Sequence, residues 1–231
     1  MGFEWDRMAF DNKEIIPVLF IIITFAIAVY VWPMVEEPMI IHWDEQGQPD
    51  GYGSKYVGLL LMPIVIAGIY ILMTIVPYIA VFKKNLKDFY KYFFQFKLFF
   101  IVFMLSLYVI TLLPNLGYQS FKMAYFMIPW IAILFFYLGY ILRFCKRNFF
   151  MGIRTPWTLA NDTVWKKTHD LASKAFVLIG IIMLISLAFI EYAIYVMVIL
   201  IFANIIFLFA YSFVEYKKIE KRVGEKGARH L

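Results

Sequence analysis

The chain has 231 residues, of which 63% are hydrophobic and 20% aromatic, and it carries a formal net charge of +6. Soluble globular domains are only about 45–50% apolar. This composition excludes an ordinary soluble domain and predicts an all-α integral membrane protein. The single cysteine, Cys145, excludes an intrachain disulfide and any cysteine-based zinc or iron–sulfur site within one chain.

Six apolar stretches are each long enough to cross a hydrocarbon core of about 30 Å. They cover residues 15–34, 56–82, 98–116, 123–142, 172–190 and 192–214. The first is not a cleavable signal, because the preceding segment carries acids as well as bases and no small-residue cleavage site follows. We therefore predict a polytopic bundle of six transmembrane helices, with an ordered outer loop and an interfacial inner loop.

The distribution of basic residues predicts the orientation of these helices. Every Lys and Arg except Lys55 and Lys122 falls on one side of the predicted membrane. The positive-inside rule places that side, with both termini, in the cytoplasm of a cell-membrane protein. This topology, together with contact with anionic lipid headgroups, accounts for the net charge, so the charge does not indicate a direct nucleic-acid partner.

The predicted organisation has four parts. They are a cytoplasmic segment (1–14), an N-terminal membrane domain (15–97) with outer loop 35–55 and inner loop 83–97, a second membrane domain (98–214) with inner loop 143–171, and a basic cytoplasmic tail (215–231). Apart from Lys174, near the inner end of the run 172–190, none of the six apolar runs contains Asp, Glu, Lys, Arg or His. Proton-coupled transporters need such groups at membrane depth, so their absence argues against a transporter.

The outer loop is acidic and rich in turn residues. Five acids (Glu36, Glu37, Asp44, Glu45 and Asp50) accompany one base, Lys55, while Gly47, Pro49, Gly51 and Gly53 mark successive turns. Three interpretations are open. The loop is a solvated structural cap, a binding surface for a cationic peptide, or a metal site in which His42, Asp44 and Asp50, or Glu36 and Glu37, supply the ligands.

The inner loop is more elaborate than a connector requires. After the basic cluster Arg143, Lys146 and Arg147, an apolar run begins at Asn148, and Gly152 permits a turn. Asn161 or Asp162 can cap a helix that starts near Thr163. We predict an interfacial segment in which the aromatic side chains dip into the headgroup layer, namely Phe149, Phe150, Trp157 and Trp165.

Two residues of this loop are candidates for chemistry. The planar fork of Arg154 can hold a phosphate, a carboxylate or backbone carbonyls, so it either contacts a ligand or partner or ties the loop to helix ends. His169 shares a helix face with Trp165 and is predicted to be a helix-surface or interfacial residue. No metalloprotease, nucleophile-elbow, phosphate-loop or dinucleotide motif is present, so we predict neither a catalytic residue nor a cofactor.

The stretch from Asn148 to Leu159, followed by Trp165-Lys-Lys-Thr-His169, resembles the signature of the SdpI family of membrane immunity proteins. The outer loop, with His42, Gly47, Asp50 and Lys55, is similar to a small membrane domain of unknown function often found N-terminal to that signature. By motif match, the signature positions in this chain are Asn148, Gly152, Arg154, Thr155, Pro156, Trp157 and Trp165.

The resemblance implies a membrane protein that protects its producer from a secreted antimicrobial peptide. It also implies, for some members, signalling by holding a transcriptional repressor at the membrane. Two alternatives are open. One is a membrane enzyme acting on lipid or peptide at the inner face, with Arg154 gripping phosphate and His169 as acid or base. The other is a transporter of small lipophilic compounds. The oligomeric state is not predicted.

Overall fold

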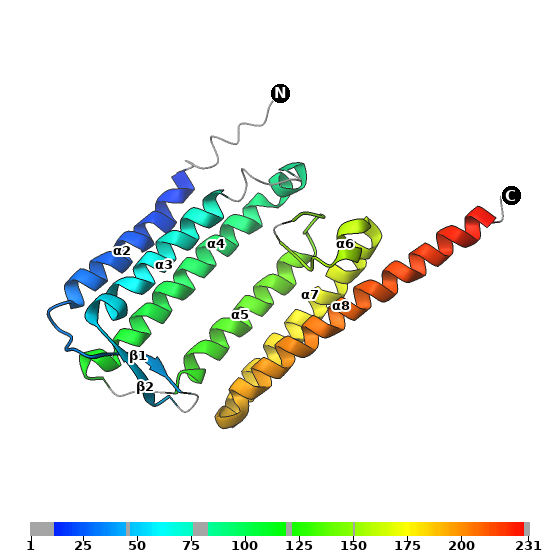
Figure 1. Ribbon diagram of the computed structural model, residues 1–231. Helices are drawn as coiled ribbons and strands as arrows, with labels where there is room; N and C mark the ends of the chain where they lie inside the picture. Colours follow the sequence, from blue (N-terminus) through cyan, green and yellow to red (C-terminus); the bar gives the residue numbers. More distant parts are fainter. Residues whose placement is uncertain (1–11, 45–46, 76–82, 119–121, 150, 229–231) are drawn as a thin grey trace. The chain divides into compact units, whose positions relative to one another are not determined.

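The computed structural model describes residues 12–44, 47–75, 83–118, 122–149 and 151–228, and confirms an all-α, membrane-type fold (Figure 1). The elements in chain order are η1 (Asn12–Glu14), α2 (Ile15–Val31), β1 (Met39–Trp43), β2 (Pro49–Gly53), α3 (Lys55–Ile75), α4 (Lys83–Leu112), η3 (Pro114–Leu116), α5 (Ala124–Leu142), α6 (Pro156–Ala160), α7 (Asp162–Ser186), η4 (Leu187–Phe189) and α8 (Ile190–Ala228).

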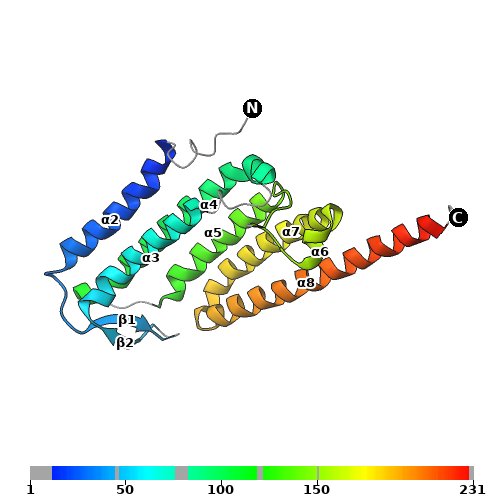
Figure 2. The ribbon, with the colours of Figure 1, turned by 45° about the horizontal axis from the view of Figure 1, so that its top comes forward.

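Five segments of the described chain are long and apolar enough to cross a membrane. The last of them, Asp162–Arg222, contains two helices, because the chain reverses at η4 and α8 runs back along α7 (Figures 1 and 2). The six predicted spans thus correspond to α2, α3, α4, α5, α7 and α8. Large apolar side chains such as Val29 (73% exposed) and Ile206 (68% exposed) are typical of helices that face lipid.

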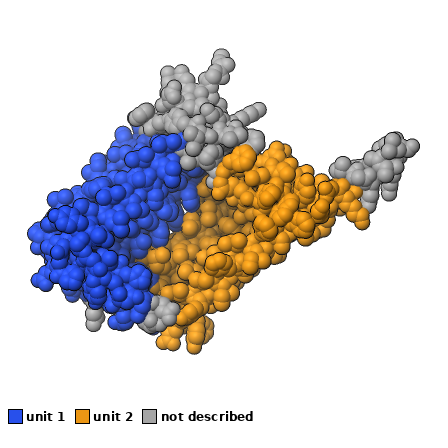
Figure 3. Space-filling view, in the orientation of Figure 1, with its two compact units in different colours: residues 1–79, 90–123 blue, residues 80–89, 124–231 orange. Residues whose placement is uncertain are grey.

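The chain divides into two compact units, residues 1–79 with 90–123 and residues 80–89 with 124–231, which are coloured separately in Figure 3. Unit 1 packs α2, α3 and the main part of α4 around Ala28, Leu59 and Tyr108. The Tyr108 hydroxyl donates to the Leu59 carbonyl at 2.9 Å, so this buried polar group has a hydrogen-bond partner.

The outer loop contains a β-hairpin that was not predicted. β1 and β2 pair antiparallel, and Met39 of β1 is buried in the helical core of unit 1. The Asn115 amide completes the edge of β1: its Oδ1 accepts from the Ile40 N–H at 2.8 Å and its Nδ2 donates to the Ile40 carbonyl at 3.0 Å. The Asn115 side chain therefore forms the hydrogen bonds that a third strand would form, and the hairpin is fixed to η3, just after α4.

The prediction that no ionisable group lies within a span was wrong. Glu14 and Lys97 fall inside the candidate spans Asn12–Val31 and Tyr90–Leu116, and Lys97 is only 1% exposed. The Lys97 ammonium contacts both Glu14 carboxylate oxygens, at 2.6 and 2.7 Å. The predicted apolar run begins at Leu98, just after Lys97, whereas α4 begins at Lys83. The sequence argument against a transporter therefore no longer holds.

Unit 2 packs α5, α7 and α8 around a core that includes Ile128, Ala132, Phe176 and Met183. The backbones of α5 and α7 approach closely at Gly139, where a Cβ would lie 2.8 Å from the Ser173 carbonyl oxygen. The Ser173 hydroxyl donates to the Gly139 carbonyl at 2.5 Å. This tight crossing holds α5 and α7 together at the point where the signature loop, residues 143–161, leaves α5.

Candidate functional site

Asn148 organises the first half of the signature loop. Its side chain is 1% exposed, and its Nδ2 donates to the carbonyls of Lys146 at 2.8 Å and Met151 at 3.1 Å. Its Oδ1 accepts from the Met151 N–H at 2.8 Å. One buried amide thus satisfies three backbone groups of a loop that has no regular hydrogen-bonding pattern of its own.

Gly152 is required by both its conformation and its surroundings. Its φ is +118°, a backbone conformation that residues other than glycine rarely adopt. A Cβ at this position would lie 2.3 Å from His169 Nε2 and 3.2 Å from the Trp165 ring. The glycine therefore allows the loop backbone to lie directly against these two side chains of α7.

His169 and Trp165 form the buried floor under that backbone. Their rings stack with centroids 4.1 Å apart and an interplanar angle of 17°. The Ile153 N–H donates to His169 Nε2 at 3.1 Å, so Nδ1 carries the proton and donates to the Trp165 carbonyl at 2.8 Å. Trp165 Nε1 donates to the Cys145 carbonyl at 2.7 Å. The imidazole is thus held neutral, with both nitrogens occupied.

The prediction of an interfacial Trp165 and a surface or interfacial His169 was wrong. Trp165 is 3% exposed and His169 is 1% exposed. The two residues do share one helix face, as their spacing indicated, but the signature loop folds over that face. The aromatic ring of Trp165 is therefore packed against protein and does not lie at the membrane surface.

The second half of the loop forms α6, a short helix that was not predicted and that rests on α8. Thr155 is its N-cap and forms a capping box with Thr158, and Pro156 occupies the first turn, where a missing N–H costs little. The Thr155 hydroxyl also donates to Ser212 Oγ of α8 at 3.0 Å. The Trp157 ring packs on two rings of α8, Phe209 at 4.8 Å and Phe213 at 5.0 Å between centroids.

Arg154 lies on the exposed side of this framework. Its guanidinium donates to the Phe149 carbonyl of the same loop. It forms no ion pair with any residue in the described part of the chain. Of the aromatic residues predicted to lie at the interface, Phe149 is exposed, Trp157 is half-buried, and Phe150 lies outside the described residues. The predicted helix cap is confirmed: Asn161 caps α7 by accepting from the N–H groups of Thr163 and Val164.

Cys145 is buried, and its thiol takes part in the loop's hydrogen bonds. It donates to the Met151 carbonyl at 3.2 Å and accepts from Asn148 Nδ2 at 3.3 Å. The residue is 6% exposed, and burial raises the pKa of the thiol to about 12. The thiol therefore remains protonated at all physiological pH values.

We expect the Cys145 thiol to resist alkylation in the folded protein. Since the thiolate is the reactive form, a pKa of about 12 predicts labelling by a maleimide at pH 8 roughly 1000-fold slower than for an ordinary thiol. The labelled fraction can be followed by mass spectrometry, with protein unfolded in dodecyl sulfate as the fully reactive control. Rapid labelling of the folded protein would contradict the described loop structure.

The outer loop presents a second group of predicted residues. His42 Nδ1 and Asp50 Oδ1 lie 2.5 Å apart across the hairpin, and both side chains are well exposed. Gly47 has a φ of +81° and forms the turn, with its N–H donating to the Asp44 carbonyl at 3.0 Å. The Lys55 N–H donates to Glu37 Oε1 at 2.7 Å, which fixes the start of α3.

The proposed metal ligands are not gathered into one group. Within residues 12–44, 47–75, 83–118, 122–149 and 151–228, no cluster of three or more His, Cys, Asp or Glu side chains could hold a metal ion. The Glu37 carboxylate accepts a hydrogen bond from the Lys55 N–H, and the Asp44 carboxylate accepts one from the Gln48 N–H at 2.8 Å. These acids stabilise turns of the loop itself.

Comparison with known proteins confirms the family resemblance predicted from the sequence. Residues 145–212 match the SdpI/YfhL protein family, and residues 19–67 match a domain of unknown function, DUF1648. The chain is 26% identical over 215 residues to the immunity protein SdpI of Bacillus subtilis (strain 168), an alignment that covers 90% of this chain and 98% of that protein. No solved structure matches the chain.

Proposed function

We propose that this chain, a multi-pass membrane protein similar to immunity protein SdpI over nearly its whole length, is itself an immunity protein that protects its producer from a secreted antimicrobial peptide. The observation that carries the proposal is the extent of the similarity, since the aligned region includes both the outer hairpin and the signature loop. We place the two termini and the signature loop in the cytoplasm, on the basis of the charge bias between the two sides.

The outer hairpin is the proposed contact for the peptide toxin. Its exposed face carries the Asp50 carboxylate beside His42 and the ring of Tyr52, which is 57% exposed. Acids attract a cationic peptide and an exposed ring can pack on its apolar side chains. Because Asn115 and Met39 fix the hairpin to the helices of unit 1, this surface is held in place before any peptide arrives.

The signature loop is the proposed contact for a cytoplasmic partner such as a transcriptional repressor. Arg154 is an exposed cation of this loop, and the Thr155–Ser212 hydrogen bond ties the loop to α8. The next helix, α7, is tied to α8 by the ion pair of Lys167 with Glu215 at 2.6 Å. A partner bound at Arg154 would therefore act on a loop that is directly bonded to the helix leading into the basic tail.

The structure offers little support for the alternative of a membrane enzyme. His169, the candidate acid or base, is buried, and both of its ring nitrogens already form hydrogen bonds. The exposed guanidinium of Arg154 turns to the Phe149 carbonyl. We therefore propose no catalytic role for either residue.

Arg154→Ala is expected to impair protection without removing the protein from the membrane. Loss of a charged hydrogen-bond donor from a partner contact costs about 1.5–3 kcal/mol, roughly 10- to 150-fold in affinity. Survival of sensitive cells exposed to secreted cationic peptides would be measured at matched protein abundance. Lys166→Ala, which removes an exposed base from the neighbouring helix, is the matched control and should protect like the wild type.

The same assay separates the two surfaces. Protection by wild type and by Arg154→Ala, together with loss in Asp50→Asn, would assign the function to the outer hairpin alone. Unimpaired protection in both variants would remove both contacts from the proposal. If the wild type itself protects against none of the peptides, the immunity function is contradicted for that class of toxin.

A further inference from the structure

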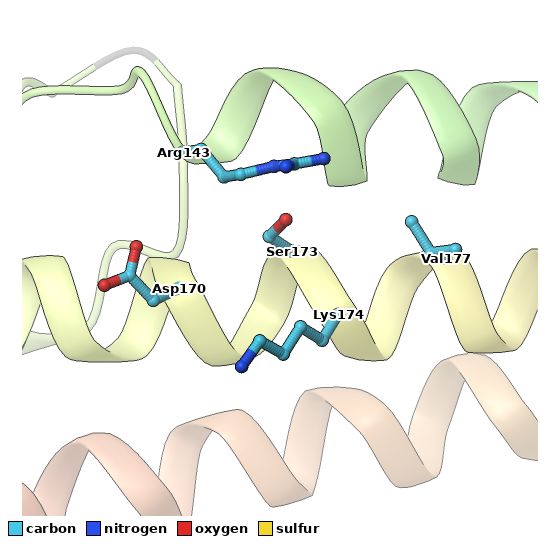
Figure 4. Close-up of a pocket in the computed structure, with 5 residues that line it drawn as sticks. All are labelled: Arg143, Asp170, Ser173, Lys174 and Val177. Carbon is cyan, nitrogen blue, oxygen red and sulfur yellow. The ribbon is translucent and has the colours of Figure 1, made fainter.

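A pocket of about 460 Å³ opens between the end of α5 and the start of the membrane-embedded part of α7. It is lined by Arg143, Asp170, Ser173, Lys174 and Val177, all of which belong to unit 2 (Figure 4). Arg143 extends from the end of α5, Asp170, Ser173 and Val177 point from α7 toward α5, and the Lys174 side chain extends from α7 away from Arg143. Of the signature loop, only Arg143 is among these lining residues.

The pocket is built on a rigid base. Just beside it, Gly139 and Ser173 bring the backbones of α5 and α7 together, and a Cβ at Gly139 would lie 2.9 Å from a methyl group of Val177. The Ser173 hydroxyl is committed to the Gly139 carbonyl at 2.5 Å. α5 ends at Leu142, directly before Arg143, and the opening lies beside this helix end.

The two cations of the pocket are available to a ligand, unlike other bases nearby. Arg147 pairs with Asp162 at 3.0 Å, and Lys167 pairs with Glu215 at 2.6 Å. Arg143 and Lys174 are exposed and form no ion pair within the described residues. The guanidinium of Arg143 only stands 6.0 Å above the Tyr140 ring. With Asp170 as the one acid, the lining carries a net positive charge.

The pocket lies at the boundary of the hydrocarbon core. Arg143 is the first residue after the candidate span Ala124–Leu142, and Lys174 lies at the corresponding end of the apolar part of α7. In a bilayer, this level is occupied by phospholipid phosphates, and basic pockets between transmembrane helices bind anionic headgroups there. A volume of this size is also in the range of small-molecule sites.

We propose that this pocket binds the headgroup of an anionic phospholipid of the phosphatidylglycerol class. The Arg143 fork holds the phosphate, and the exposed Lys174 side chain turns toward it from α7 when the lipid binds. Asp170 accepts from a hydroxyl group of the headgroup, and the half-exposed apolar wall at Val177 contacts the start of the acyl chains. The site is independent of the proposed immunity function, since it uses neither Arg154 nor the outer hairpin.

The test measures binding of short-chain phosphatidylglycerol to the full-length protein in an uncharged detergent, by native mass spectrometry. Arg143→Gln/Lys174→Gln is expected to weaken binding about 10- to 30-fold, because each base near an anionic lipid surface raises the affinity roughly 3- to 5-fold. Lys166→Gln/Arg222→Gln removes the same two charges from exposed positions outside the pocket and should change binding by less than about 2-fold. Equal weakening in the two double variants would overturn the proposal.

Two further arms identify the ligand. Phosphatidylcholine with the same chains should bind far more weakly, and equal binding would overturn the anionic assignment. Inorganic phosphate should not displace the lipid at millimolar concentration. Displacement with the same dependence on Arg143 and Lys174 would assign the pocket to a soluble phosphate compound and overturn the lipid assignment.

Asp170→Asn keeps the result interpretable if the double variant fails to fold. This substitution removes the negative charge that repels the phosphate and retains an oxygen acceptor for the headgroup hydroxyl. Binding of phosphatidylglycerol should tighten about 3-fold, a gain that damage to the fold cannot produce. Weaker or unchanged binding in Asp170→Asn would count against the pocket as the lipid site.

Discussion

Lys97→Met is expected to lower the free energy of unfolding by about 3–5 kcal/mol, because it removes the cation that pairs with the buried Glu14 carboxylate. The ammonium also stands 5.0 Å above the Tyr70 ring and 5.2 Å above the Phe94 ring, so methionine retains the packing of the side chain while losing these electrostatic contacts. The measurement is the unfolding free energy in mixed micelles, followed by circular dichroism.

The double variant Glu14→Gln/Lys97→Met separates the charge from the packing. If the loss arises from an unpaired buried carboxylate, neutralising Glu14 should recover most of it. Lys91→Met, the same substitution at an exposed position of α4, should cost less than about 0.5 kcal/mol. A double variant as unstable as Lys97→Met alone would show that the ion pair is not the source of the effect.

Gly152→Ala is expected to destabilise the protein by about 2–5 kcal/mol and to abolish protection. The added Cβ must be accommodated 2.3 Å from His169 Nε2 while the backbone keeps a φ of +118°. Moving the loop away would break the hydrogen bond from the Ile153 N–H to His169. Unfolding free energy and survival of toxin-exposed cells are the two readouts.

Gly117→Ala is the control for the conformational part of this effect. Gly117 has a φ of +84°, but a Cβ there would meet no atom within 4 Å. The substitution should therefore cost only the backbone strain, about 1–2 kcal/mol. Similar losses of stability for Gly152→Ala and Gly117→Ala would mean that the close contact with His169 adds nothing to the effect of the backbone conformation.

The helices could be predicted from the sequence because each contains a long apolar run. The number of consecutive apolar residues shows directly whether a helix is long enough to cross a membrane. The hairpin was missed because β2 reads Pro-Asp-Gly-Tyr-Gly, which is typical of turns. The run Met-Ile-Ile-His-Trp of β1 has the β-branched and aromatic residues of a strand and could have indicated it. Nothing in a single sequence pairs Glu14 with Lys97, which are 83 residues apart.

At the candidate site, features that depend on neighbouring residues could be predicted from the sequence, whereas contacts between distant segments could not. The Asn161 cap and the shared face of Trp165 and His169 depend only on neighbouring residues, and both are present. Their burial depends on the loop from Asn148 to Ile153 folding back over α7, which spacing alone does not report. The role of Ser212 as the partner of Thr155 requires α8 to return beside α6, and no local signal indicates it.

α8 has a mechanical consequence for the molecule. It runs for 39 residues, about 58 Å at roughly 1.5 Å per residue, whereas a hydrocarbon core is only about 30 Å thick. The hydrogen bond from Thr155 to Ser212 and the ion pair of Lys167 with Glu215 hold this helix near its middle. α8 therefore pivots about its contacts with Thr155 and Lys167 when it tilts. A small tilt of the membrane-embedded arm therefore swings the basic arm through an arc of comparable size, without any change in its own secondary structure.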